Sequence, residues 1–394
     1  MIKTFCYFSN WSLDDYHARI YGIDYFQSLG FEVVVCNMTM LLNPHLKFRE
    51  KPPELSVAHE IEIGSWRDLD VFLDGRSGLF GIALLTLEQK TVPFYRALRR
   101  FNVPYLNFYS TNIPAPSLKN KFLGVPSWRR DYWRAIFKAF LGRVWRYFSG
   151  HIPGLQPPRY LLRFGKRFIL NCPTPNAHTR LIDSHTIDFD LTLENQTNQI
   201  CSESKTAIFL DEFLFGHTDF MMGGGSFPIR DANRYFSALR KLFDSIETSM
   251  GYRIIIAAHP RAPNPFKDIR FGKREIIQHQ TAKLVRHSDF VLTHCSTSIS
   301  FAVLFRKPIV FLNSDEIKNG PMGPLSTSFA RAFGQLPINL DSFDKIPIPV
   351  PIVSELLYKE YEENYIKYPH SPRRSLWPMV RDEMVKDGLI SPVL

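Results

Sequence analysis

Polar side chains stand directly after two apolar runs of the sequence, in "RIIIAAHPRAP" and "DFVLTHCSTSIS". His259 ends the first run, and Ser296, Thr297 and Ser298 stand where a helix is expected to begin after the second. A helix N-terminus offers unpaired N–H groups and partial positive charge, and hydroxyls beside it can help to surround a phosphate. Helix capping by the hydroxyls and a structural histidine are the alternatives. The two segments together favour a site for phosphate or carboxylate.

Further polar residues flank these two segments. Pro260 restricts the backbone of the residue before it toward an extended conformation, and Arg261 adds a positive charge, in the same pocket or at the surface. His294 precedes the three hydroxyls at the expected strand end. After the last apolar run, Asp315 and Glu316 could accept hydrogen bonds from ribose hydroxyls or belong to a solvated turn. All are candidates for nucleotide or donor binding.

Two carboxylates, Asp211 and Glu212, end the run "TAIFLDE". A carboxylate at a strand end is well placed to take a proton from a hydroxyl, although helix capping or ion pairing is the alternative. The following segment "GHTDFMMGGGSF" contains His217 and Asp219 and could close over a ligand. Its glycines match neither the dinucleotide-binding nor the Walker pattern. We therefore expect general-base chemistry from the carboxylate pair and ligand contacts from the glycine-rich segment.

The early part of the chain supplies candidates for binding the acceptor or the donor sugar. Ser9, Asn10 and Asp14 follow the first expected strand in "YFSNWSLDDYH", and Asp74 and Arg76 follow another in "FLDGRS". If both segments are strands of one parallel sheet, these five side chains face the cleft at its carboxyl edge.

Aspartate pairs of the D-x-D type occur at Asp68/Asp70 and at Asp188/Asp190. Such pairs hold Mg²⁺ or Mn²⁺ in some glycosyltransferases. The first pair precedes an expected strand, and the second alternates with apolar residues in "IDFDL", which predicts one solvated strand face. We therefore expect no metal site, and no cofactor beyond a donor substrate.

The elements that must position these residues alternate between strand and helix. Expected strands of the first part are "KTFCYFS", "FEVVVCN", "DLDVFLDGRS" and "VPYLNFYS", with helices at "DDYHARIYGIDYFQSLG" and within about 79–101. Expected strands of the second part are "TAIFLDE", "YRIIIAAHP", "DFVLTHC" and "PIVFLN", with helices at "RDANRYFSALRKLFDSIETSMG", "TAKLVRHS" and "SISFAVLFRK". This alternation predicts an α/β fold with two Rossmann-like parallel-sheet domains facing across a cleft.

Domain boundaries follow from changes in composition. The turn-rich linker "ENQTNQICSESK" separates an N-terminal domain, 1–195, from a C-terminal nucleotide-binding domain, 205–345. A basic amphipathic insertion is expected at about 126–168. The helical tail, 346–394, is expected to pack back on the N-terminal domain.

Composition limits the class of protein. A chain of 394 residues suits two domains, and a net charge of +10 favours an anionic partner. The five scattered cysteines form no C-x-x-C pair, so we expect neither a disulfide framework nor a zinc site, and a reducing cytoplasm fits best. We expect no signal peptide in "MIKTFCYF" and no spanning helix, because no run of about 18 apolar residues occurs.

The segment Trp128–Arg167 carries ten Lys or Arg residues and one acid, Asp131, with aromatic residues at helical spacing. A basic helix with Trp and Phe on one face suits an anionic membrane interface. The alternative is a helix packed on the N-terminal domain with a solvated basic back. No nucleic-acid-binding module accompanies the charge. We therefore expect a cytoplasmic protein that is peripheral on the inner face of the membrane.

The motifs discussed above occur in the order Asp211-Glu212, His259-Pro260 and Ser296-Thr297-Ser298. They resemble the carboxylate pair, the His-Pro motif and the Ser/Ser-Thr motif of bacterial sialyltransferases, polysialyltransferases and related capsule enzymes, which have the GT-B fold and use CMP-activated sugars. The resemblance covers chiefly residues 206–316, and Phe213 stands where those families usually have glycine. The stretch "SDFVLTHCSTSISFAVLFRKPIVFL" also resembles teichoic-acid polymerases that use CDP-glycerol.

The resemblance implies an acid as general base, Asp211, a histidine on the CMP phosphate, His259, and hydroxyls on the phosphate or the donor carboxylate. The expected function is transfer of an acidic sugar, such as sialic, legionaminic or pseudaminic acid or Kdo, from a CMP donor to a surface glycan or capsule acceptor. Open alternatives are a CDP-glycerol-type phosphotransferase, a nucleotide-sugar epimerase, and a non-catalytic capsule-assembly or lipid-binding protein of the same fold.

Overall fold

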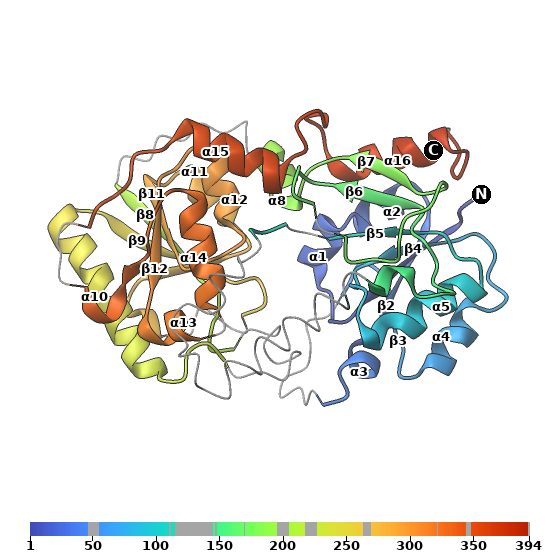
Figure 1. Ribbon diagram of the computed structural model, residues 1–394, viewed down its shortest axis with the longest axis horizontal. Helices are drawn as coiled ribbons and strands as arrows, with labels where there is room; N and C mark the ends of the chain where they lie inside the picture. Colours follow the sequence, from blue (N-terminus) through green and yellow to red (C-terminus); the bar gives the residue numbers. More distant parts are fainter. Residues whose placement is uncertain are drawn as a thin grey trace.

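The computed structural model describes residues 1–45, 55–109, 112–114, 145, 148–168, 170–194, 205–216, 227–262, 269–320, 322–343 and 348–392. These residues form two α/β halves that lie side by side (Figure 1). His217, Asp219 and about half of the predicted basic segment Trp128–Arg167, namely 128–144, 146 and 147, lie outside the described residues.

The N-terminal half contains a seven-stranded parallel sheet with the order β3-β2-β1-β4-β5-β6-β7. Its strands are β1 (Thr4–Ser9), β2 (Glu32–Asn37), β3 (His59–Glu62), β4 (Leu79–Ala83), β5 (Tyr105–Asn107), β6 (Tyr160–Arg163) and β7 (Arg180–Asp183). The central strands β1 and β4 are buried along their whole length. Such burial on both faces explains why their sequences are continuous apolar runs.

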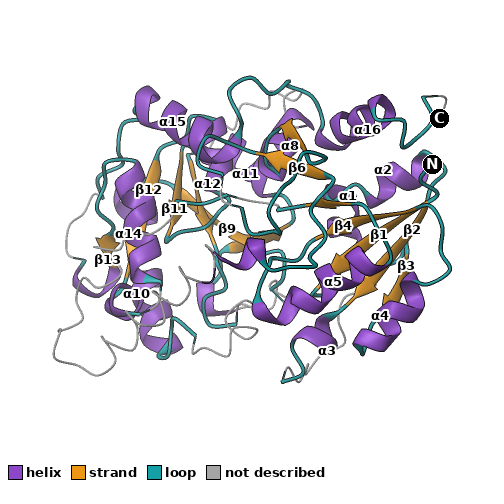
Figure 2. Cartoon of the chain, turned by 45° about the vertical axis from the view of Figure 1, so that its right-hand side comes forward, coloured by secondary structure: helices purple, strands orange, loops and turns teal. Residues whose placement is uncertain are grey.

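Helices cover both faces of this sheet (Figure 2). They are α1 (Asp15–Ile20), α2 (Ile23–Ser28), α3 (Thr39–Leu42), α4 (Trp66–Leu73) and α5 (Val92–Arg100), with 3₁₀ turns η1 (Gln89–Thr91) and η2 (Ser149–His151). Side chains of β1 serve the two faces: Phe5 stacks on Phe26 with ring centroids 4.0 Å apart, and Phe8 meets Phe94 at 5.0 Å. The sheet therefore has an aromatic core on each side.

The C-terminal half contains a six-stranded parallel sheet with the order β10-β9-β8-β11-β12-β13. Its strands are β8 (Thr206–Leu210), β9 (Arg253–Ala258), β10 (Glu275–Gln278), β11 (Phe290–Thr293), β12 (Ile309–Asn313) and β13 (Ile338–Asn339). Its helices are α10 (Ala232–Met250), α11 (Thr281–Arg286), α12 (Ile299–Leu304), α13 (Asp315–Asn319) and α14 (Gly323–Ala332), with 3₁₀ turns η4 (Ile269–Phe271) and η5 (Leu340–Ser342). The predicted fold class, an α/β protein with two Rossmann-like parallel-sheet halves, is confirmed.

Helix α10 shows how directly local sequence sets an element. Asp231 caps its first turn by accepting a hydrogen bond from the Arg234 amide, and Gly251 ends it in the left-handed conformation, with φ of 73°. The buried face includes Tyr235 and Phe236, so the predicted helix is confirmed.

Two segments connect the halves. Helix α8 (Ile187–Glu194) follows the N-terminal sheet but packs against α11 and α12 of the C-terminal half. At the end of the chain come α15 (Glu355–Tyr361), the π-helical turn η6 (Glu362–Ile366) and α16 (Leu376–Lys386). Figure 1 shows α15 beside the C-terminal half and α16 beside β6 and β7 of the N-terminal half. The chain therefore crosses between the halves twice.

Helix α16 is part of the N-terminal half's core. The Trp377 Nε1–H donates to the Ile20 carbonyl at 3.0 Å, and the indole packs against Phe26 and Phe108. A Cβ on Gly22 would lie 2.4 Å from this indole, so only glycine permits the approach.

Two predicted strands are wrong. The segment "DLDVFLDGRS" belongs largely to helix α4, in which Leu69, Phe72 and Leu73 are buried and Ser65 caps the first turn. The segment "IDFDL" lies in helix α8. In both, aspartates at alternate positions imitate the period of a strand. In α4 the buried residues lie on one face of the helix, whereas in α8 the apolar residues are spread over more than one face.

Two further boundaries differ from prediction. Leu79–Ala83, expected to be helical, is the buried strand β4. Tyr160–Arg163, expected within the basic insertion, is strand β6 and pairs with β5 and β7. Both segments are too short for periodicity to separate helix from strand.

A carboxylate fastens α16 to the sheet. Asp387, 10% exposed, binds Arg159 at 2.5 Å, accepts a hydrogen bond from the Tyr160 hydroxyl at 2.8 Å, and pairs with Arg180. Asp387→Asn removes the negative charge that these partners share and is expected to destabilise the protein by about 2 kcal/mol, measured by thermal unfolding. Asp382→Asn, at a more exposed ion pair, is the control and is expected to cost less than about 1 kcal/mol. Equal effects would contradict this role for Asp387.

Candidate functional site

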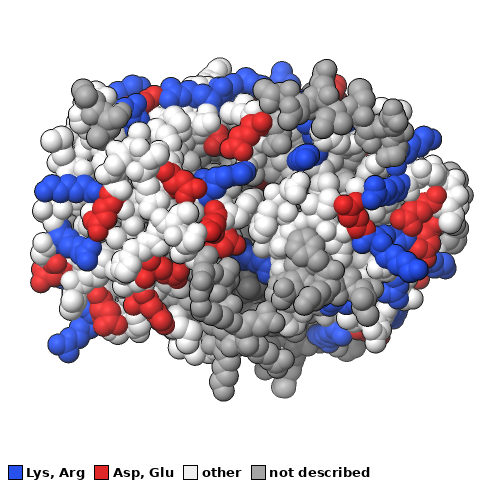
Figure 3. Space-filling model, turned by 180° about the vertical axis from the view of Figure 1, so that it is seen from behind, with Lys and Arg blue, Asp and Glu red and all other residues white. Residues whose placement is uncertain are grey.

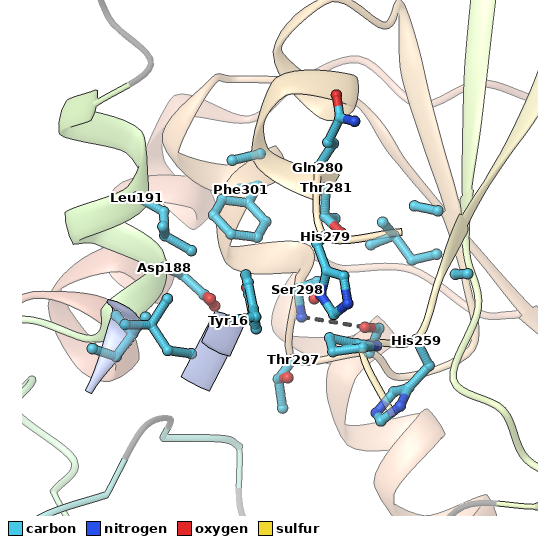
Figure 4. Close-up of a pocket in the computed structure, with 18 of the residues that line it drawn as sticks. Tyr16, Asp188, Leu191, His259, His279, Gln280, Thr281, Thr297, Ser298 and Phe301 are labelled. Atoms are coloured by element: carbon cyan, nitrogen blue, oxygen red, sulfur yellow. Dashed lines mark hydrogen bonds between the residues drawn. The ribbon is translucent and has the colours of Figure 1, made fainter. Parts of the chain in front are cut away.

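A cavity of about 430 Å³ lies between the two halves, at the carboxyl edge of the C-terminal sheet. The ends of β8, β9 and β10 and the loop before α12 form one wall, α1 forms the facing wall, and α8 closes one side (Figure 4). In open parallel sheets this edge is where ligands bind. We call this cavity the interdomain pocket.

Seven residues predicted from the sequence line the interdomain pocket: Asp211, His259, Pro260, Arg261, Ser296, Thr297 and Ser298. The last three form a tight turn after β11. The Thr293 hydroxyl accepts from the Ser296 amide at 3.1 Å, and the Ser296 hydroxyl accepts from the Ser298 amide at 3.2 Å. Hydroxyls and backbone amides are thus gathered at one place in the wall.

Glu212 holds this turn from behind. Its Oε1 accepts hydrogen bonds from the Thr293 hydroxyl at 2.7 Å, the His294 amide at 3.0 Å and the Cys295 amide at 2.9 Å. The side chain is buried and does not line the interdomain pocket. Glu212 therefore has a positioning role, because strand alternation sends it away from Asp211.

Three other candidates of the C-terminal half also lie outside the pocket lining. His294 is buried, with Nε2 2.7 Å from the Tyr235 hydroxyl and Nδ1 3.1 Å from the Leu312 carbonyl oxygen. Asp315 and Glu316 form the first turn of α13, where Ser314 caps the helix, and bind neighbouring loops. They are not near enough to line the cavity as nucleotide ligands.

The loop after β9 is held in one shape by its own hydrogen bonds. The Arg261 amide donates to His259 Nδ1 at 3.1 Å, so a neutral ring carries its proton on Nε2. The Gln278 amide nitrogen donates to the carbonyls of His259, Pro260 and Ala262 at 2.9–3.1 Å. His259 is thereby fixed as a hydrogen-bond donor at the pocket wall.

Asp211 begins a tight turn at the end of β8. Its Oδ1 accepts from the Phe213 amide at 3.0 Å, and Phe213 has φ of 51°. This is the left-handed conformation, which glycine adopts without strain and a phenylalanine rarely does. The Phe213 ring packs over Gly216, where a Cβ would lie 2.3 Å from it.

The N-terminal half contributes a carboxylate–imidazole pair on α1. Asp14 caps the helix, accepts from the His17 amide at 2.9 Å, and lies 2.6 Å from His17 Nδ1. Burial opposes ionisation, but the hydrogen bond and charge of His17 outweigh it and lower the pKa of Asp14. With Nδ1 turned to a carboxylate, Nε2 is the basic nitrogen of a neutral His17 ring. His17 is buried and lines the interdomain pocket, which sequence reasoning did not anticipate.

One contact crosses the interdomain pocket, and a second joins the halves beside it. The ring of Tyr16, on α1, lies over His279, with centroids 4.5 Å apart. His279, at the end of β10, has φ of 62°, and burial lowers its pKa. The Arg261 guanidinium lies 5.6 Å from the centre of the Trp11 ring. The two halves therefore touch within the site itself.

The remaining N-terminal candidates do not line the interdomain pocket. Ser9 is buried and donates to a nearby backbone carbonyl, and Asn10 follows it at the end of β1. Asp74 is the C-cap of α4, and Arg76 lies over the Phe72 ring at 4.5 Å. The expectation that Asp74 and Arg76 face the cleft is wrong, because they precede β4 and so lie at its amino end.

Asp188 is an unforeseen member of the pocket wall. On α8 rather than on a solvated strand, it faces the cavity beside Tyr16 (Figure 4). Burial raises its pKa to about 7, although a hydrogen bond from Ser300 acts in the opposite direction. Its Oδ2 is buried without a hydrogen-bond partner in the described part of the chain. The sequence analysis predicted a solvated strand face for Asp188, and no pattern in the sequence identifies it as a pocket residue.

Charged side chains of both signs line the pocket, with Arg19, Arg261 and Lys283 among the cations. On the back of the molecule Lys and Arg are interspersed with Asp and Glu (Figure 3). Among the described residues, no group of three or more His, Cys, Asp or Glu side chains could hold a metal ion. In the same part of the chain, every helix is too short or too polar to cross a membrane.

No family model and no curated protein matches this chain. Solved structures that resemble it include the calicheamicin glycosyltransferase CalG4 (10% identity, 100% of each chain covered, TM-score 0.49). MnaA of S. aureus, in a co-structure with UDP, has 15% identity over 99% of this chain and 98% of that one, with a TM-score of 0.48. A variant of the wall teichoic acid polymerase TagF has 13% identity over 98% and 90%, with a TM-score of 0.49. Likenesses this distant do not decide an activity.

The raised pKa of Asp188 makes stability depend on pH. Its pKa is 3.8 in an unfolded reference and about 7 in the fold, so between these values the fold holds a proton that the unfolded chain has released. Stability should therefore fall as pH rises from about 4 to about 7. Asp188→Asn should remove this loss. Melting temperatures of both proteins at about pH 5 and pH 8 test this prediction. The melting temperature of the variant, relative to that of the wild type, should be higher at pH 8 than at pH 5. The same difference at both pH values would contradict the assignment.

Proposed function

We propose that the protein is a glycosyltransferase that takes a sugar from a nucleotide donor in the interdomain pocket. The observation that carries this proposal is the meeting, in one cavity, of the Ser296–Ser298 turn and His259 with His17 of the opposite half, whose ring Asp14 holds from behind. The first group suits the phosphate of a donor, and the second suits a hydroxyl acceptor. A pocket built only for binding does not need an oriented base.

The donor's phosphate would lie against the Ser296–Ser298 turn. Its hydroxyls can donate to phosphate oxygens, as can the Nε2–H of His259. Arg261 and Lys283 add positive charge to the same cavity. Donors that are fixed before the reaction stabilise charge as it develops on the leaving phosphate, which is often the largest contribution in such sites.

In the proposed reaction His17 Nε2 takes the proton of the acceptor hydroxyl. The acceptor oxygen forms a bond to the anomeric carbon, the bond from that carbon to the phosphate oxygen breaks, and its electron pair leaves with the nucleotide. Asp14 holds the imidazole and stabilises the positive charge that it gains. Asp211, the base suggested by sequence, lies on the donor side and is the competing candidate.

The identity of the donor is proposed from the motifs. Their resemblance to CMP-sugar enzymes supports a CMP-linked acidic sugar, a surface glycan or capsule acceptor, and no further cofactor. The resemblance to CDP-glycerol polymerases supports a phosphotransferase as second candidate. We also propose a cytoplasmic enzyme held on the inner membrane face through the basic segment Trp128–Arg167, on the evidence of its composition.

A panel of nucleotides tests the donor. CMP or CDP should raise the melting temperature, because a ligand that binds the fold and not the unfolded chain stabilises by mass action. GDP should have a much smaller effect at the same concentration, and UDP should also be weaker. Equal stabilisation by GDP or UDP would count against a cytidine donor, and no effect of any nucleotide would remove the basis of the proposal.

Substitution of the two candidate bases tests the mechanism. His17→Ala should lower transfer by about 10²–10⁴-fold, the usual contribution of a general base, while CMP affinity stays the same. Asp14→Asn should lose much of that rate, because the amide no longer fixes the ring. His178→Ala, at an exposed histidine outside the pocket, is the control and should transfer normally. If Asp211→Asn abolishes transfer and His17→Ala does not, the base is Asp211.

A further inference from the structure

A second cavity, of about 240 Å³, lies beside another face of helix α8. Asp188 and Leu191 of α8 line the interdomain pocket, whereas Phe189 and Thr192 line the second cavity. Its other lining residues come from α11, α12 and the C-terminal segment. No part of the proposed transfer reaction uses it.

Three arginines surround this cavity, which we call the arginine pocket: Arg286, Arg306 and Arg373. They come from the end of α11, the end of α12 and the loop before α16, so their convergence is produced by the tertiary fold. Glu362 is the carboxylate that lines the cavity, and it pairs with Arg306 at 3.0 Å. Arg306 also pairs with Glu355 at 3.1 Å, on the exposed side of the cavity. Three guanidinium groups against two carboxylates still leave an excess of positive charge.

The floor of the arginine pocket is apolar. Phe189, which is buried, lies there with Leu304 and Phe305. The Arg373 guanidinium lies 5.4 Å from the centre of the Phe189 ring, which places this exposed side chain over the floor. Apolar surroundings lower the local dielectric and strengthen the attraction between the arginines and an anion.

The backbone at Arg306 supports a role for this side chain. Arg306 follows Phe305, the C-cap of α12, and has φ of 55°, the left-handed conformation that usually falls to glycine just after a helix. An arginine here costs conformational energy that a glycine would avoid. Its guanidinium bonds the Val303 carbonyl and turns to Glu355 and Glu362. The residue in this left-handed position is therefore a cation that lines the cavity and pairs with two carboxylates.

We propose that the arginine pocket is a second binding site, for the phosphate or carboxylate group of a small anionic ligand. Guanidinium groups match both oxyanions with paired N–H donors, and an apolar floor limits competition from water. Glu362, and to a smaller extent the exposed Glu355, opposes binding, so the affinity reflects the balance between three cations and two anions. This proposal does not depend on the transfer reaction.

Calorimetric titration with pyrophosphate, and separately with N-acetylneuraminic acid, tests the site and distinguishes the two chemistries. At least one probe should bind to the wild-type protein at a site whose affinity for it falls about tenfold in Arg373→Gln, because a charge-assisted hydrogen bond is lost. Glu362→Gln keeps the shape of the side chain but removes its negative charge, and should raise the affinity of the same site about fivefold. A tighter variant is a result that mere loss of folding cannot produce.

Two controls assign the binding to this cavity. Arg374→Gln removes the same charge one residue away, at a side chain that pairs with Asp382, and should leave affinity unchanged. Arg261→Gln alters the interdomain pocket and should leave unchanged the affinity of the site that Arg373→Gln weakens. The proposal is overturned if neither probe binds, if Arg373→Gln and Arg374→Gln act alike, or if only Arg261→Gln weakens binding.

Discussion

The candidate site depends on one buried carboxyl group. Glu212 Oε1 accepts from the Thr293 hydroxyl and from two amides after β11, and this joins the end of β8 to the turn that carries Ser296–Ser298. The two strands are already neighbours in the sheet, but strand pairing alone does not fix the turn beyond them. Without this acceptor, buried donors would be left unpaired, at a cost of about 1–3 kcal/mol each. The geometry of the Ser296–Ser298 turn is thus a by-product of satisfying buried hydrogen bonds.

Much of the fold could be predicted because its central elements repeat a strong local signal. Strands such as β8 and β9 are uninterrupted apolar runs ended by polar residues, and α10 has both a capping aspartate and a terminal glycine. Helices α4 and α8 could not be predicted, because eight residues with alternating acids fit either period. The two-residue strand β13 carries too little pattern to be recognised.

The site could be predicted only where one rule sufficed. Residues at the carboxyl ends of parallel strands face a common cleft, and His259 and Asp211 obey this rule. The rule cannot tell which of two adjacent residues points outward, and Glu212 points inward. The rule also does not cover side chains that other elements contribute, such as His17 on α1 and Asp188 on α8. Their positions follow from how the halves meet, which tertiary packing decides.

The place of Trp377 in the N-terminal core has a consequence for biosynthesis. About 190 residues separate the last strand of that sheet from α16, and a ribosome needs about 10 to 40 seconds to add them. During this interval the faces of Phe26 and Phe108 that the indole will cover have no partner from α16. The first half to be made is therefore the last to be finished, and its unfinished core is open to chaperones until translation ends.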